Sequence, residues 1–245
     1  MKIAEGVHLI ASGRLGVSLT HPLDCNAYAV RCGSRYWLID SGVGCETERI
    51  FEQLRADGID PADVEALLLT HYHLDHSGGA HVMHTRHGIS VWAGMETAKA
   101  VESADEEAIS LGAAKRAGVY PMDFPFHACP VERVLEEGEV FRAGDEEIQA
   151  IAAPGHSRDM MVYLVRVSDT AMLFPGDVVF HGGTVSLQAT HDCDTFAYAA
   201  SLRRLASLSF DMMFPGHGLW AVSEGRRHVD AAMQHINRLL LPPSL

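Results

Sequence analysis

The residues best suited to chemistry lie in one short stretch, His71-Tyr72-His73-Leu74-Asp75-His76. This 71–76 motif follows the apolar run 64–69, which predicts a buried strand. Side chains alternate along an extended chain, so His71 and His73 point to the same side and can hold one metal ion. Asp75 and His76 lie beyond the bend and can face a second metal ion beside the first. Imidazole and carboxylate groups suit zinc, and also iron or manganese.

Further candidate ligands follow a repeated dipeptide. Proline and glycine precede a histidine or an aspartate at Pro154-Gly155-His156, Pro175-Gly176-Asp177 and Pro215-Gly216-His217. Each tripeptide comes after a strand-like run, and a turn at the end of a strand is where a rigid scaffold presents functional residues. Together with the 71–76 motif, these turns predict a metal centre assembled from distant parts of the chain.

With these residues, the sequence resembles the metallo-β-lactamase-fold superfamily of metallohydrolases, in its branch of glyoxalase II and lactonase-like enzymes. The resemblance runs from about residue 26 to residue 217. It rests on the 71–76 motif, on the Pro-Gly turns and on Asp40 in Leu38-Ile39-Asp40-Ser41-Gly42. It implies an α/β fold, a four-layer αβ/βα sandwich in a single domain spanning residues 1–245, with the metals at one edge of the two sheets.

The resemblance also implies a role for each candidate residue. The first metal would be held by His71, His73 and His156. The second would be held by Asp75, His76 and His217, and Asp177 would bridge the two. Asp40 would contact no metal; it would hydrogen-bond a ligand and fix the orientation of that ligand.

Such a ligand set predicts two divalent metal ions about 3.5–4 Å apart. Zinc is the expected metal, and iron or manganese is also suited. The expected activity is hydrolysis of a small ester, lactone or thioester by a metal-bound hydroxide. Asp75, a ligand that can also carry a proton, is the expected catalytic acid and base. True β-lactamases commonly have a cysteine where Asp177 stands, so antibiotic hydrolysis is not expected.

The sequence leaves the substrate open. Homoserine-lactone lactonases of this family usually have a tyrosine three residues after the bridging aspartate, where this chain has Phe180. Only 28 residues follow His217, and they predict one helix rather than the helical domain with which related enzymes bind glutathione. The loop 20–25 and the aromatic segment 120–127 are candidate pocket walls, and His181 is a candidate substrate contact.

Two alternative functions stay open. Persulfide dioxygenases on this fold use one iron, held by the positions that match His71, His156 and Asp177. The same residues therefore allow a mononuclear-iron oxidoreductase. A metal-binding module without catalysis would contain metal but turn over no ester or lactone. Metal analysis separates the oxidoreductase from the hydrolase, and an ester and lactone panel separates the module without catalysis.

The elements that must position these residues are strands and helices in mixed order. Apolar, β-rich runs predict strands at 7–10, 27–30, 36–40, 64–69, 89–93, 147–151, 161–165, 171–174 and 212–214. Helical patterns or Ala- and Glu-rich composition predict helices at 46–57, 81–87, 94–117, 195–207 and 222–240, with Asp194 as the N-cap of the fourth. Segment 119–130 predicts a loop. No linker interrupts this order, which favours one α/β domain.

Composition narrows the function further. The formal net charge of −13, from 19 basic and 32 acidic side chains, would repel DNA or RNA. The five cysteines contain no C-x-x-C pair, which disfavours a disulfide framework or a thiolate zinc site. Neither a signal peptide nor a membrane-spanning run of about 18 apolar residues is present, so the expected location is the cytoplasm. The expected partner is a small-molecule substrate, and because many relatives are dimers, a homodimer is an expected assembly.

Overall fold

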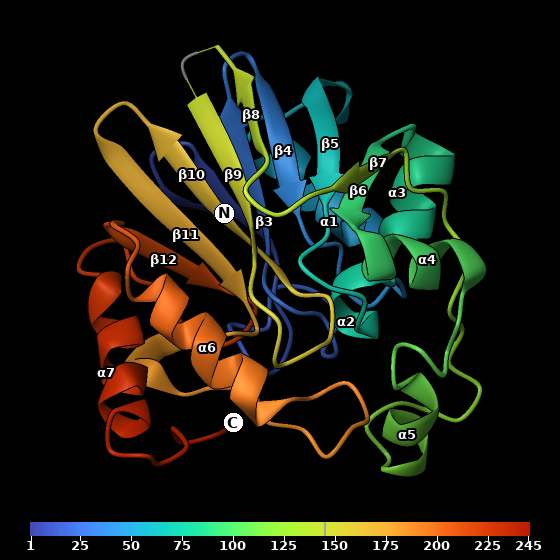
Figure 1. The fold of residues 1–245 in the computed structure, drawn as a ribbon. Helices are drawn as coiled ribbons and strands as arrows, with labels where there is room; N and C mark the ends of the chain where they lie inside the picture. The colour runs from blue at the N-terminus through green and yellow to red at the C-terminus, as the bar shows by residue number, and fades with distance from the viewer. Residues whose placement is uncertain (145) are drawn as a thin grey trace.

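Two β-sheets face each other at the centre of the molecule. The computed structural model describes residues 1–144 and 146–245 (Figure 1). The seven-stranded sheet has the order β1 (Lys2–Ala4), β2 (Val7–Ala11), β3 (Ala27–Cys32), β4 (Arg35–Ile39), β5 (Val64–Leu68), β6 (Ser90–Gly94) and β7 (Arg133–Leu135). The five-stranded sheet has the order β12 (Met212–Pro215), β11 (Thr170–Gly176), β10 (Met161–Val167), β9 (Glu146–Ala152) and β8 (Val140–Ala143).

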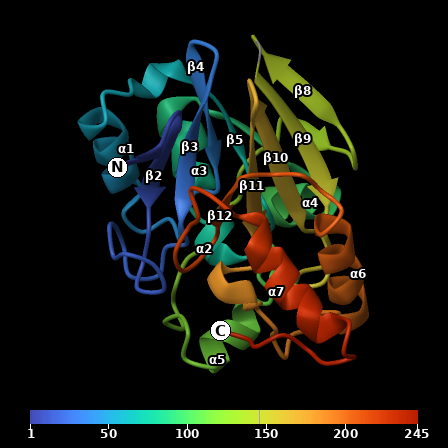
Figure 2. The ribbon, with the colours of Figure 1, turned by 90° about the vertical axis from the view of Figure 1, so that its left-hand side faces the viewer.

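Helices cover the outer face of each sheet (Figures 1 and 2). The seven-stranded sheet is covered by α1 (Thr47–Ala56), α3 (Ala80–His87) and α4 (Met95–Ser103). The five-stranded sheet is covered by α6 (Thr195–Leu205) and α7 (Arg226–Ile236). The remaining helical segments are short: η1 (Pro61–Asp63), α2 (Leu74–Ser77), α5 (Leu111–Arg116) and η2 (His181–Gly183). None of the helices that the structure describes is long and apolar enough to cross a membrane.

The buried apolar side chains form the layers between these elements. Between the sheets, Tyr28 contacts Phe174 and Phe214 through aromatic rings 5.5 and 5.7 Å apart. Strand β5 is buried on both faces: Leu68 packs between the sheets, whereas Leu67 packs under the outer helices. A strand buried on both faces is apolar at successive positions rather than at alternate ones, as residues 66–68 are; Glu65, near the start of the strand, is exposed. The predicted four-layer αβ/βα sandwich is confirmed.

Two predicted helices differ from the structure. The segment 94–117 is two helices, α4 and α5, because Ala104 and Ser110 adopt left-handed backbone conformations with φ of 50° and 58°. The closing helix covers only Arg226–Ile236, and Glu224 and Leu239 beyond its ends also have positive φ. Helical composition persists through such breaks, so composition alone overestimates helix length.

Candidate metal centre

The 71–76 motif begins where β5 ends. Its second half forms α2, which presents Asp75 and His76 to the centre. Two glycines let α2 approach the loop that follows β4. A Cβ on Gly78 would lie 2.3 Å from the Val43 carbonyl oxygen, and one on Gly79 would lie 2.1 Å from the Ser41 carbonyl oxygen. No residue with a side chain fits there, so these glycines determine where α2 sits.

The three Pro-Gly turns all reach the same edge of the five-stranded sheet. Strands β9 and β11 are both antiparallel to β10, and β12 is parallel to β11, so the three strands end on one side. Two of the turns have no room for a side chain at glycine. A Cβ on Gly155, which has φ of 143°, would lie 2.4 Å from Tyr198 Cα, and one on Gly216 would lie 2.3 Å from Asp177 Oδ1.

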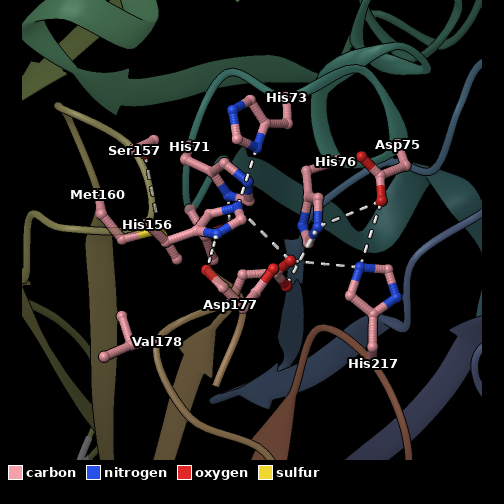
Figure 3. Close-up of polar contacts among 12 residues, drawn as sticks. His71, His73, Asp75, His76, His156, Ser157, Met160, Asp177, Val178 and His217 are labelled. Atoms are coloured by element: carbon pink, nitrogen blue, oxygen red, sulfur yellow. Dashed lines mark hydrogen bonds and ion pairs between the residues drawn. The ribbon is translucent and has the colours of Figure 1, made fainter. Parts of the chain in front are cut away.

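All seven predicted ligands meet at this edge (Figure 3). Asp177 lies in the middle, with its Oδ2 3.6 Å from His156 Nε2 and 3.3 Å from His217 Nε2. Its Oδ1 lies 3.3 Å from His76 Nε2. On the remaining sides, His73 Nδ1 lies 2.9 Å from His156 Nε2, and Asp75 Oδ2 lies 3.2 Å from His217 Nε2.

The donor atoms fall into overlapping groups that fit a divalent metal site. Ligand atoms lie within 4.8 Å of one another in the sets His71–His73–His156, His71–His76–Asp177 and Asp75–His76–His217. Among the described residues, His71 Nε2, His76 Nε2 and Asp177 Oδ1 are buried without a hydrogen-bond partner. Buried polar atoms nearly always have one. Unpartnered nitrogen and oxygen atoms within 4.8 Å of one another match the donors of a bound cation.

Asp40 is hydrogen-bonded to one of the candidate ligands and reaches a second through Thr70. Its Oδ2 accepts a 2.8 Å hydrogen bond from His76 Nδ1 and another of 2.8 Å from the Thr70 hydroxyl. The Thr70 hydroxyl oxygen in turn lies 3.0 Å from His71 Nδ1. Asp40 has φ of 62°, an uncommon backbone conformation that this network holds in place. The structure thus places Asp40 one hydrogen bond from His76 and two from His71, in contact with the candidate ligands but outside their donor sets.

One contact of the centre carries no signal in the sequence. Asp192 Oδ2 lies 3.0 Å from His73 Nε2, on the side of the ring that faces away from the other ligands. The same carboxylate accepts hydrogen bonds of 3.0 Å from the Tyr72 hydroxyl and 3.0 Å from the Ser110 hydroxyl. Asp192 belongs to no motif, and only the folded chain brings it to His73. The neighbouring Asp194, as predicted, caps α6.

The electrostatics of the site keep several of the candidate donors deprotonated. Burial, together with the neighbouring imidazoles, holds the pKa of His71 well below its usual value, and the same causes lower the pKa of His156 to about 4. Burial alone would raise the pKa of Asp177, but the charges of His217 and His76 outweigh it and hold that pKa well below its usual value. His71, His156 and Asp177 are therefore deprotonated at neutral pH, as metal ligands must be. The pKa of His76 is instead raised well above its usual value and that of His217 to about 9, so both would release a proton on binding metal.

A cavity of about 520 Å³ opens over the centre. His73, Asp75, Asp177 and His217 form its floor. Its walls are formed by α5 and the residues around it, by residues 186–190 and by Leu15 and Leu245. The Tyr120 hydroxyl, on one wall, donates a 3.2 Å hydrogen bond to Asp75 Oδ1.

The predicted pocket walls are partly found here. Tyr120 lines the cavity, but the rest of the segment 120–127 and the loop 20–25 do not. Phe124 is buried in a small apolar cluster, and Asp24 instead accepts hydrogen bonds from Thr20 and from the backbone of Val43. His181 is exposed and lies 4.3 Å, ring to ring, from His228 rather than in the cavity.

Comparisons with known proteins agree with this geometry. A family model described as "Metallo-beta-lactamase superfamily" matches residues 21–217. The chain is 28% identical to an "Atrochrysone carboxyl ACP thioesterase" of Aspergillus fumigatus, over 79% of this chain and 50% of that protein. It is 29% identical to "Acyl-coenzyme A thioesterase MBLAC2" of Gallus gallus, over 78% of this chain and 72% of that protein. The chain therefore spans about half the length of the fungal relative that it matches.

Solved structures show the same fold. A Cronobacter sakazakii metallo-β-lactamase with a HARLDQ motif superposes with a TM-score of 0.71 at 20% identity, over 97% of this chain and 86% of that one. BJP-1, a subclass B3 metallo-β-lactamase of Bradyrhizobium japonicum, gives 0.70 at 21% identity, over 88% and 86%. At these identities the likeness shows the fold alone.

Proposed function

The chain belongs to the metallo-beta-lactamase superfamily, and on this basis we propose that it is a two-metal hydrolase of thioesters. The observation that carries the proposal is the meeting of seven candidate metal ligands, Asp177 and six side chains around it, at the floor of an apolar cavity. The names of its relatives, thioesterases for acyl-carrier-protein and acyl-coenzyme A substrates, favour a thioester over the ester and lactone that the ligand set equally allows.

The donor groups support two metal ions rather than one. His71, His73 and His156 form one set of three nitrogen donors, and Asp75, His76 and His217 form a second set. Asp177 reaches both sets, with one oxygen toward His76 and the other toward His156. A carboxylate that two donor sets share would hold two divalent ions close together; zinc is the expected metal. Two such ions would activate a water molecule and polarise the thioester carbonyl.

The residues of the chain supply the rest of the mechanism. Asp75 has one oxygen directed at His217, and the other accepts a hydrogen bond from Tyr120. It is placed to take the proton of the attacking water and pass it to the departing thiolate. Tyr120 holds the carboxylate in that orientation. The apolar side chains above exclude bulk water, which strengthens each electrostatic interaction at the floor.

A substrate panel tests this proposal. The purified protein, loaded with zinc, is assayed against acyl thioesters, the matching oxygen esters and lactones. Thioester hydrolysis that a chelator abolishes and zinc restores is expected. The Asp177→Ala variant should lose the second metal and nearly all turnover. Lactone hydrolysis without thioester hydrolysis would contradict the proposal, as would one iron per chain with thiol-dependent oxygen uptake.

A further inference from the structure

We propose that the cavity binds the linear, uncharged acyl chain of the thioester, and that Ala114 and Ala117 on the α5 wall set the length of chain accepted. This inference rests on the proposed thioesterase function and names the substrate class of the same site. It follows from the chemistry of the cavity walls, from the spacing of the small residues and from the way in which α5 is attached to the centre.

The first observation is the separation of charge within the cavity. Among the described residues that line it, the only Asp, Glu, Lys or Arg side chains are Asp75 and Asp177, and both belong to the floor. The wall side chains are uncharged, in a protein with 51 charged side chains. A charged acyl group such as a dicarboxylic acid would lose its hydration there without a partner. The walls therefore match a hydrocarbon chain whose reacting end lies at the floor.

The second observation is the pattern of side-chain size on one face of the α5 segment. Leu111, Ala114 and Ala117 are three residues apart, a spacing that places them on the same face of a helix, and all three line the cavity. Leu111 is buried, so it forms the fixed base of this face. The two alanines leave open the volume that larger side chains would fill. The cavity lining also includes Leu15, Leu187 and Ala189.

The third observation is that α5 is tied to the metal centre. The Ser110 hydroxyl, one residue before α5, bonds the same Asp192 carboxylate that contacts His73. At the other end of the helix, buried Lys115 forms a 2.8 Å ion pair with Glu106. The distance between the alanines and the reacting carbonyl is thus held by a short chain of contacts. A wall held at a constant distance from the reacting atoms limits the length of the acyl chain that fits.

Hydrolysis of a series of unbranched acyl thioesters, from acetyl to dodecanoyl, tests the inference. For the native protein kcat/KM should rise about fourfold for each methylene group that the cavity buries, until it is full. Ala114→Leu and Ala117→Leu each fill part of the cavity with a residue that favours helix. Each should lower kcat/KM for decanoyl thioester about tenfold or more and leave acetyl thioester within about twofold. Ala200→Leu, the same change on the exposed face of α6, should alter neither.

Binding of S-alkyl thioethers of pantetheine to the metal-free protein, measured by calorimetry, distinguishes the acyl site from the thioesterase activity. The decyl thioether should bind more tightly than the ethyl thioether, and both alanine variants should remove that difference. Thioether binding of this kind without any hydrolysis would contradict the proposed function but support the acyl site. Hydrolysis with a flat chain-length profile, or alanine variants that behave like Ala200→Leu, would overturn the acyl site.

Discussion

His73 Nε2 lies 3.0 Å from Asp192 Oδ2, while the other ring nitrogen faces the remaining ligands of the candidate centre. A carboxylate behind a ligating histidine fixes the ring and raises its basicity, and removing it typically costs about 10–100-fold in metal affinity. Asp192→Asn should therefore weaken binding of the metal held by His73 about 10-fold or more, as measured by competition with a chromophoric chelator. Asp194→Asn is the matched control, because asparagine also caps a helix. Equal metal affinity in both variants would contradict this role for Asp192.

Tyr120 makes a second testable contact with the centre. Its hydroxyl donates a 3.2 Å hydrogen bond to Asp75 Oδ1 from the wall of the cavity. A hydrogen bond to a charged group contributes about 1.5–3 kcal/mol, so Tyr120→Phe should lower kcat about tenfold or more. Metal content should not change, because Tyr120 contacts Oδ1 of Asp75, whereas Oδ2 is the oxygen that faces His217 and the second donor set. Tyr36→Phe, on the outer apolar layer, serves as the control. A Tyr120→Phe enzyme with native kcat would show that this hydroxyl does not act on Asp75.

The Pro-Gly-His turn at 215–217 leaves no room for a side chain at Gly216. A Cβ on Gly216 would lie 2.3 Å from Asp177 Oδ1 and 2.7 Å from His76 Cε1. Gly216→Ala should thus displace the central carboxylate and lower metal content and turnover together. At Gly218, which has φ of 73°, no atom lies within 4 Å of such a Cβ, so alanine there costs only backbone strain, about 1 kcal/mol. Metal analysis should show loss in the first variant alone; equal loss in both would assign the effect to strain.

His228, which is not one of the candidate metal ligands, should make the stability of the fold depend on pH. It is buried, and its Nδ1 accepts a 2.9 Å hydrogen bond from the Gly182 backbone N–H, so the ring must be neutral in the fold. Burial, and then the charges of His181 and Arg227, lower its pKa to about 4. The unfolded chain, with a histidine pKa of about 6.5, binds more protons between these values. The stabilisation is therefore complete above about pH 6.5 and is lost as the pH falls toward the folded pKa.

Urea titrations of the native protein and of His228→Gln test this expectation. Glutamine retains a hydrogen-bond acceptor but does not titrate. The free energy of unfolding of the native protein should fall relative to that of the variant as the pH is lowered from 7 to about 4.5. A constant difference between the two over this range would mean that His228 does not titrate as the fold requires.

The sequence predicted those parts of the site that local patterns determine. The 71–76 motif and the Pro-Gly turns are each contiguous, and the strands before them carry clear apolar patterns, so the chain order indicates a metal site in one α/β domain. The sandwich itself follows from the resemblance to the metallo-β-lactamase-fold superfamily. The glycine at 216 could be recognised as part of a turn, but its contact with Asp177 depends on two strands pairing side by side.

Other features depend on contacts between residues far apart in the sequence. Asp192 meets His73 across 119 positions, and Tyr120 meets Asp75 across 45. The break between α4 and α5 follows from the left-handed backbone at Ala104 and Ser110, where composition still favours helix. Because that break lets α5 turn back over the centre, the cavity wall was also beyond prediction from helical pattern alone.

Turnover of a decanoyl thioester, followed while zinc is added stepwise to metal-free protein, tests the central claim most directly. Asp177 and the six donor residues arranged around it predict that activity rises to a plateau at two equivalents of zinc per chain. A plateau at one equivalent, or hydrolysis that does not depend on zinc, would contradict the two-metal thioesterase.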